Sequence, residues 1–260
     1  MTREAWSEAA AIARRAEEVH PAGAWLRDER AQLAVRTGNW AEALRLAGPN
    51  APRAALATAA AQSEPDPQTA LKLSKQAWKQ SPGFAPAALA YAKNLRAAGR
   101  DSRAFDVIRE AWRAKPQPEL AAFWLDPIGD KLTRVREAGR LAAANPDAAE
   151  THLMLAGVHL AAGLTGEARH HLEAARAAGM NQKRFWVLLA DVEAAERGET
   201  EAGRVAQRDA LRRAATAEPD PRWHCEVCGT EQPHWLPICP ACHTPGRITW
   251  SAARLALPAS

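Results

Sequence analysis

Four cysteines are the residues of this chain whose types and spacing best define a chemical site. Cys225 and Cys228 form one Cys-x-x-Cys pair, and Cys239 and Cys242 form a second pair ten residues later. Two such turns can bring four thiolates to the corners of a tetrahedron, and Zn²⁺ most often occupies a closed four-sulfur site. A module this short cannot build its own core, so the metal should supply most of its folding free energy. We therefore expect residues 218–260 to form a structural zinc knuckle followed by a tail.

The residues around the cysteines are typical of a compact knuckle. Gly229 follows the first pair, where the turn often needs a positive φ, and Pro240 stiffens the second turn. Trp223, Trp235 and Trp250 are expected to form a small apolar face that packs against the last helix. These rings could alternatively stack on nucleic-acid bases, but the basic residues that should accompany them are missing.

Other uses of the cysteines are less favoured. Iron is chemically compatible, because a rubredoxin-like site has the same ligands. Disulfides and a redox-active pair lack support, since there is no export signal, no cysteine in the helical part and no βαβ context. His224, His234 and His243 flank the ligands, and we interpret them as surface residues or neighbours of the ligands because four cysteines suffice. Cys239-Pro240 matches the dipeptide of haem-responsive motifs, but zinc-knuckle turns contain it too, so we favour zinc over haem.

The rest of the sequence contains no pattern that indicates catalysis. It has no glycine-rich phosphate loop, nucleophile elbow or HExxH pair. His152, His159, His170 and His171 are close in the chain, but helical packing explains their positions, so a catalytic or haem-binding pair is the less favoured interpretation. We expect a non-enzymatic protein without catalytic residues.

The elements that must position the knuckle are helices, and they recur. A small residue, another seven positions later and a proline five positions after that form a repeated pattern. The copies are Ala70, Ala77 and Pro82; Ala104, Ala111 and Pro116; and Ala168 and Ala175, with Met180 where the proline would fall. Residues seven apart lie on nearly the same helix face, where alanine lets a partner helix approach closely, and proline then ends the helix.

The segments before these copies also match, so each unit is a helical hairpin. Tyr91, Ala92, Leu95 and Gly99 precede the second copy, and Leu155, Ala156, His159 and Gly163 precede the third. The 34-residue period resembles the tetratricopeptide repeat. We therefore predict an all-α fold in which residues 1–217 form a tetratricopeptide-like helical-hairpin solenoid.

Three further units are less regular. Two degenerate units lie around Gly38-Asn39-Trp40 and from Asp130 to Pro146, and a last hairpin turns at Gly198. The spacing from Ala104 to Ala168 is 64 rather than 68, so the middle unit should be shortened.

The start of the chain has the pattern of a second helix without its first. Ala9, Ala16 and Pro21 show the seven-then-five spacing, so residues 2–20 are predicted to be the second helix of a hairpin. The first helix would then precede Met1, and the chain would be part of a longer protein. The alternative is that this helix caps the stack alone.

Repeats followed by this knuckle resemble two related bacterial groups. One is the HemY-type protein associated with haem biosynthesis, and the other is the LapB-type adaptor, which controls lipopolysaccharide synthesis through a membrane protease. The likeness rests on GNWAEALRLAG in the early repeats and PRWHCEVCGTEQPHWLPICPACHTPGRITW at the end, the latter being closer to HemY-type proteins. Both families begin with membrane-spanning helices, which this sequence lacks.

The resemblance and the composition together define the expected function. The net charge of +4 is spread over the chain, which argues against nucleic acid as a partner. We expect a scaffold whose concave repeat surface binds a protein, with HemY-type haem biosynthesis as the implied pathway. A LapB-like adaptor and an iron electron-transfer module remain alternatives. The sequence has no membrane span, so we expect a cytoplasmic location, or the cytoplasmic face of the inner membrane if an N-terminal anchor is missing.

Overall fold

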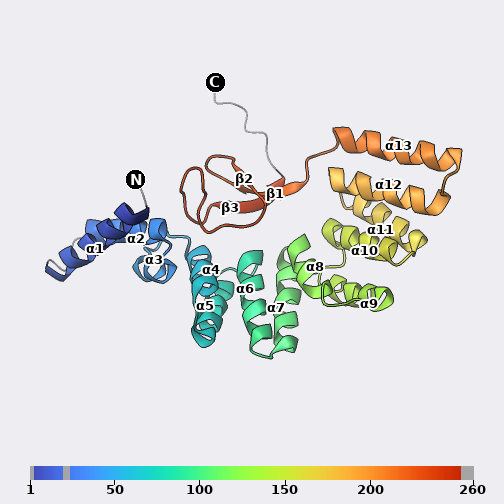
Figure 1. The fold of residues 1–260 in the computed structure, drawn as a ribbon. Helices are drawn as coiled ribbons and strands as arrows, with labels where there is room; N and C mark the ends of the chain where they lie inside the picture. Colours follow the sequence, from blue (N-terminus) through green and yellow to red (C-terminus); the bar gives the residue numbers. More distant parts are fainter. Residues whose placement is uncertain (1–2, 20–23, 253–260) are drawn as a thin grey trace, which may run out of the picture. The chain divides into compact units, whose positions relative to one another are not determined.

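A computed structural model describes residues 3–19 and 24–252 (Figure 1). In this part of the chain, thirteen helices precede a three-stranded sheet. The chain divides into two compact units, residues 1–104 with 222–250 and residues 105–221 with 251–260. No helix among the described residues is long and apolar enough to cross a membrane.

The first unit contains the early helices and the cysteine module. Its elements are α1 (Arg3–Val19), α2 (Ala24–Thr37), α3 (Trp40–Leu46), α4 (Arg53–Ser63), α5 (Pro67–Gln80), α6 (Ala85–Ala97), β1 (Pro221–Cys225), β2 (Glu231–Gln232) and β3 (Ile248–Ala252). Successive helices pack against each other, α1 on α2, α3 on α4, and α5 on both α4 and α6. These elements form hairpins, as the repeat pattern predicts.

The second unit consists of helices. Helix α7 (Asp101–Ala114) leads into it, and α8 (Pro118–Leu125), α9 (Lys131–Ala142), α10 (Ala149–Ala161), α11 (Thr165–Ala177), α12 (Lys183–Arg197) and α13 (Glu201–Thr216) follow. Helix α10 packs on α11, and α12 packs on α13. The predicted last hairpin, with its turn at Gly198, is therefore present.

Local sequence explains where the repeated helices begin and which face they bury. In α5, the Asp66 side chain accepts a hydrogen bond from the Thr69 amide at 2.8 Å, and Pro67 occupies the first turn. The six alanines of the three pattern copies are all buried, with exposed fractions of 5% or less (Ala70, Ala77, Ala104, Ala111, Ala168 and Ala175). The prediction that alanine at a spacing of seven marks the packed face is confirmed for these helices.

Helix α1 uses a different face. Ala13 is buried there, whereas Ala16 is exposed and Ile12 is 62% exposed. The spacing of Ala9 and Ala16 therefore does not mark a buried stripe in this helix. Met1 and Pro21, which belong to the same prediction, lie outside the described residues.

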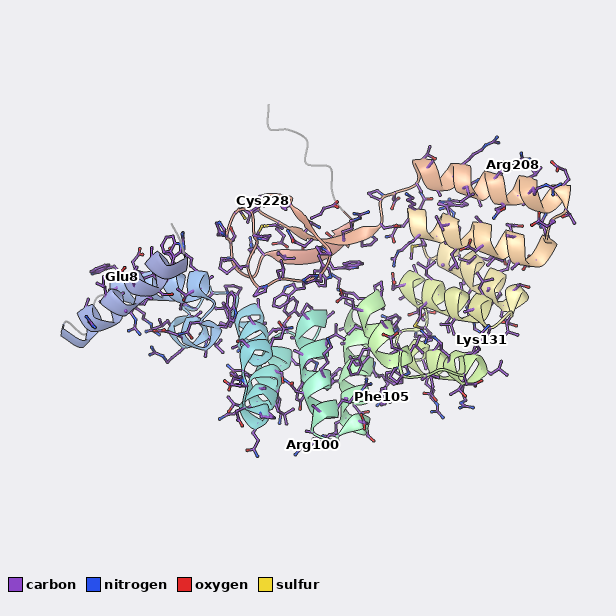
Figure 2. All side chains as sticks on the ribbon, viewed as in Figure 1. Glu8, Arg100, Phe105, Lys131, Arg208 and Cys228 are labelled. Carbon is purple, nitrogen blue, oxygen red and sulfur yellow. The ribbon has the colours of Figure 1, made fainter. Side chains whose placement is uncertain are left out.

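The middle unit is shortened, as predicted, because α8 has only eight residues. Trp124 of α8 makes contacts with the helices on either side. The ring of Trp124 lies 4.7 Å from that of Phe105 (labelled in Figure 2), and the Trp124 indole N–H donates to the Glu137 carbonyl of α9 at 3.1 Å. Helix α9 itself begins at a cap, since Asp130 accepts from the Thr133 amide at 2.7 Å.

Candidate metal centre

The four cysteines lie on a small sheet and the two turns that extend from it. The strands are arranged in the order β2-β1-β3, and β1 pairs antiparallel with β2, with Trp223 opposite Gln232. Cys225 is the last residue of β1, so the first cysteine turn begins where the strand ends. The sheet therefore fixes the direction in which this turn leaves the strand.

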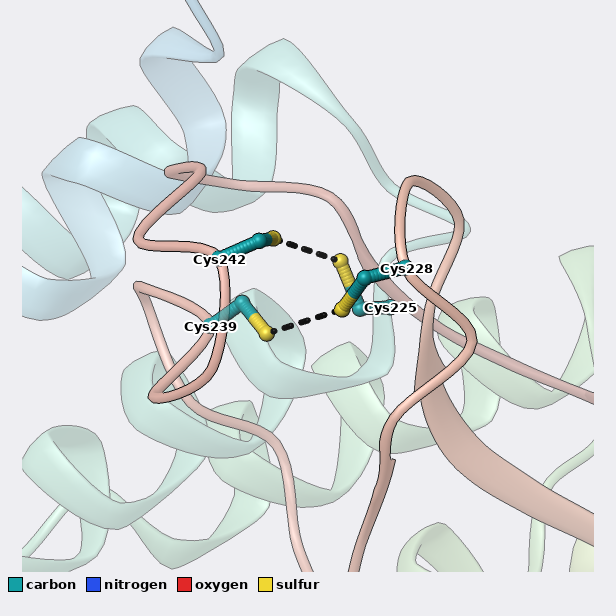
Figure 3. A group of neighbouring side chains, drawn as sticks. All are labelled: Cys225, Cys228, Cys239 and Cys242. Atoms are coloured by element: carbon teal, nitrogen blue, oxygen red, sulfur yellow. Dashed lines mark hydrogen bonds between the residues drawn. The ribbon is translucent and has the colours of Figure 1, made fainter.

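The four sulfur atoms converge on one point (Figure 3). All lie within 4.8 Å of one another, and Cys225 to Cys242 and Cys228 to Cys239 are both 3.6 Å apart. Sulfurs bonded to one tetrahedral Zn²⁺ at about 2.3 Å would be separated by about 3.8 Å. The donor set and its spacing thus fit a structural metal ion, and a four-thiolate set suits zinc or iron.

The first cysteine turn is held by its backbone. The Gly229 amide donates to the Cys225 carbonyl at 2.8 Å, and the Cys225 amide donates to the Thr230 carbonyl at 3.0 Å. Gly229 has φ +74°, as the sequence predicted. The Thr230 hydroxyl lies 3.2 Å from the Cys228 sulfur, so it can donate to the thiolate.

The second turn repeats this geometry with one costly difference. The His243 amide donates to the Cys239 carbonyl at 2.9 Å, and the Cys239 amide donates to the Thr244 carbonyl at 3.1 Å. The Thr244 hydroxyl lies 3.3 Å from the Cys242 sulfur. His243 stands where the first turn has glycine and adopts φ 57°, the left-handed conformation that is strained for a side chain with a Cβ.

These contacts divide the thiols by acidity. The hydroxyl and the amide of Thr230 lower the pKa of Cys228 to about 6, and the Thr244 hydroxyl lowers the pKa of Cys242. Burial raises the pKa of Cys225 to about 11. Two of the four positions therefore favour the thiolate that binds metals, and the charge of a bound cation would offset the cost at Cys225.

The two threonines were not singled out in the sequence, although a signal for them exists. Each lies two residues after the second cysteine of its pair, at Thr230 and Thr244. This regularity makes the unit Cys-x-x-Cys-x-Thr in both turns.

The knuckle packs on α4 and on the residue that precedes α6, so the prediction that its tryptophans pack against the last helix is wrong. The apolar cluster of Trp223, Trp235 and Ile248 contains Ala55 of α4, and Phe84 packs against it. The rings of Trp235 and Phe84 are 5.4 Å apart, edge to face. A Cβ built on Gly246 would lie 2.4 Å from the Pro52 Cβ, so the backbone of the knuckle at Gly246 lies directly against the Pro52 ring.

The histidines near the cysteines are not within reach of the sulfur cluster as ligands. Among the described residues, the four cysteines are the only group of three or more side chains whose ligand atoms converge in this way. His224 is half-buried within β1, and His234 and His243 are exposed. The histidines of α10 and α11 form a separate cluster in the second unit.

Comparison with known proteins identifies a repeat in one part of the chain. No curated protein sequence matches the chain. A crystal structure of MamA is similar with TM-score 0.38 and 16% identity, over 61% of this chain and 92% of that one. The APC/C hetero-tetramer Cut9-Hcn1 gives TM-score 0.40 and 16% identity over 81% of this chain, which spans 43% of that one. A tetratricopeptide repeat family model matches residues 59–123, so the stretch from the end of α4 into α8 is similar to this repeat.

Proposed function

We propose that the chain is a non-enzymatic scaffold that binds a protein segment, with Cys225, Cys228, Cys239 and Cys242 holding a structural Zn²⁺. In this proposal residues 1–217 are the repeat part and residues 218–260 are the knuckle and its tail. The observation that carries the proposal is a groove in the first unit whose walls come from both parts. A structural ion bound by the knuckle would hold the wall that the knuckle contributes to this groove in place.

The groove consists of two adjoining hollows. One, of about 410 Å³, lies between α2, the start of α3 and the knuckle, and the other, of about 520 Å³, lies between α2, α3, α4 and the knuckle. Both are bordered by Val35 and Arg36 of α2 and by His243 of the second cysteine turn. Helix α3 and the segment that follows it supply small apolar side chains to the second hollow, namely Ala43, Ala47 and Ala51. A surface of this kind suits an apolar side chain presented by a polypeptide.

A matched pair of variants tests the groove. Gln32 is exposed and lines the larger hollow, so Gln32→Trp should fill the space and abolish capture of the physiological partner from host lysate. Gln68 is exposed on α5 away from the groove lining, and Gln68→Trp should leave capture intact. Equal capture by both variants would show that the groove is not the binding surface.

Removing the metal tests the role of the knuckle. A chelator should abolish hydrogen-exchange protection in residues 222–250, while the circular dichroism of the helices changes little, because the knuckle's folding depends on the ion. Partner capture should fall with it and return when Zn²⁺ is restored. Retained protection after complete metal removal would contradict a structural role for the metal.

The pathway and the ion are the finer parts of the proposal. The resemblance of residues 221–250 to HemY-type proteins favours a role in haem biosynthesis at the cytoplasmic face of the inner membrane, so the captured partner should be a haem-synthesis enzyme. Capture of a membrane protease instead would support the LapB-like alternative. Elemental analysis of protein from its own host should give about one zinc per chain. Iron with visible charge-transfer bands would support electron transfer, and a Soret band would show that haem is bound.

A further inference from the structure

Half of the eight histidines in the chain gather on one hairpin of the second unit. His152 and His159 belong to α10, and His170 and His171 belong to α11. His171 is at the centre, since its ring centroid lies 5.0 Å from that of His159, 5.5 Å from His170 and 5.6 Å from His152. The scaffold function assigns no role to this cluster.

Two of the rings are spaced as ligands of one ion would be. The Nδ1 atoms of His152 and His171 are 3.3 Å apart. Two nitrogens bonded at about 2.0–2.1 Å to the same tetrahedral ion are separated by about 3.4 Å. Without an ion, the same distance suits a hydrogen bond in which one neutral ring donates and the other accepts.

The neighbouring His159 is oriented as metal-binding histidines usually are. Its Nδ1 lies 2.8 Å from the Leu155 carbonyl, which can only accept, so Nδ1 carries the proton and Nε2 carries the lone pair. Metal-ligating imidazoles typically donate their other N–H to a carbonyl or carboxylate in this way. Among the described residues, however, only the four cysteines form a group of three or more ligand atoms within 4.8 Å of one another, so His159 lies beside the pair and is not a third ligand in this arrangement.

His171 is also held uncharged at neutral pH by its surroundings. Burial, followed by the adjacent His159, His152 and His170, lowers the pKa of His171 to about 4, and only Glu167 on the preceding turn of α11 opposes this. A cation therefore does not have to displace a proton from His171. A metal ion also brings positive charge to this place, and coordination bonds from the two imidazoles can offset that cost.

We propose that His152 and His171 bind a transition-metal ion at a site separate from the four cysteines. Imidazole ligands suit Zn²⁺, Ni²⁺ and Co²⁺, whereas four thiolates select zinc or iron. The ion would join α10 to α11, the hairpin that carries the third copy of the repeat pattern. This site does not depend on the scaffold function, because it lies in a different unit from the groove.

The test uses the full chain without a polyhistidine tag, loaded with one equivalent of Zn²⁺ so that the cysteines are occupied. Isothermal titration with Ni²⁺ at pH 7.5 should reveal one further ion per chain. His152→Gln and His171→Gln should each weaken this binding more than about tenfold. His170→Gln is the matched control, since His170 is exposed on the same helix and should leave the affinity unchanged.

Two further measurements complete the test. Co²⁺ bound at the second site should show d–d bands without the intense thiolate charge-transfer band that a four-cysteine site produces. The circular dichroism of each variant without Ni²⁺ should match that of the parent, so that a lost site is not a lost fold. Uptake of no second ion by the zinc-loaded parent would overturn the proposal, and so would unchanged affinity in both His152→Gln and His171→Gln.

Discussion

The contact between Gly246 and Pro52 gives the sharpest test of where the knuckle docks. These residues are far apart in the sequence, yet a Cβ on Gly246 would lie 2.4 Å from the Pro52 Cβ and 2.6 Å from its Cγ. The Ala55 Cβ would be 3.2 Å away. Gly246 also has φ +64°, so Gly246→Ala would face both a strained backbone and a steric clash.

The size of the effect follows from these two parts. An L-residue in the left-handed region costs about 1–2 kcal/mol. Relief of the overlap requires the rigid proline ring and the knuckle backbone to separate by roughly 1 Å, and overpacking of this kind costs about 1–3 kcal/mol. Gly246→Ala should therefore destabilise the docked knuckle by about 2–5 kcal/mol.

Hydrogen exchange of residues 222–250, with the metal bound, measures the free energy of opening. Gly229→Ala is the matched control, because Gly229 has φ +74° in the same knuckle but no atom lies within 4 Å of the position that its Cβ would take. It should cost only the backbone strain, about 1–2 kcal/mol. Equal losses in the two variants, with the metal content unchanged in both, would refute docking of the knuckle on α4.

A double-mutant cycle isolates the contact itself. Pro52→Gly removes the two nearest of the three atoms that the new Cβ would meet, so Gly246→Ala in this background should lose most of its steric part. The coupling energy between the two sites should then be about 1–3 kcal/mol. A coupling near zero would mean that the clash is relieved by local movement at Gly246.

Three other predictions concern single residues. His243→Gly should relieve the left-handed strain of the second cysteine turn and stabilise this turn by about 0.5–1 kcal/mol. Hydrogen exchange of residues 239–246 measures the change, and a loss of stability would show that His243 is not strained. Thr151 is buried, and its hydroxyl accepts a hydrogen bond from the Trp112 indole N–H at 3.1 Å and donates one to the Asn145 carbonyl at 2.7 Å. Thr151→Val should therefore lower the free energy of unfolding, measured with urea, by about 1–3 kcal/mol. An unchanged free energy would show that the indole and the carbonyl find other partners. The pKa of His171 is about 4 in the folded chain against an ordinary 6.5, so the unfolded chain binds more protons between these values and stability should fall as the pH drops through this window. His171→Gln should flatten the dependence of the melting temperature on pH, and an unchanged dependence would contradict the low pKa.

Features that depend on short stretches of sequence were predictable. The alanines seven apart define one face of a single helix, so burial of Ala77 or Ala175 follows from the helical period and the need for close packing. The cysteine turns are equally local, because each Cys-x-x-Cys loop spans only a few residues. In the first turn these residues include Gly229, whose φ is positive. The strained His243 was missed because its position corresponds to Gly229 only once the two turns are recognised as equivalent.

The sequence by itself therefore determined the helices, their hairpin pairing and the convergence of the four thiols. Only the tertiary structure decided that the knuckle packs on α4 and Phe84 rather than on the preceding helix, because apolar tryptophans are satisfied by any apolar surface of suitable shape. The choice depends on contacts such as Gly246 with Pro52, which no local pattern encodes. The same reason applies to His152 and His171, whose nitrogens meet only because two neighbouring helices pack with one particular offset.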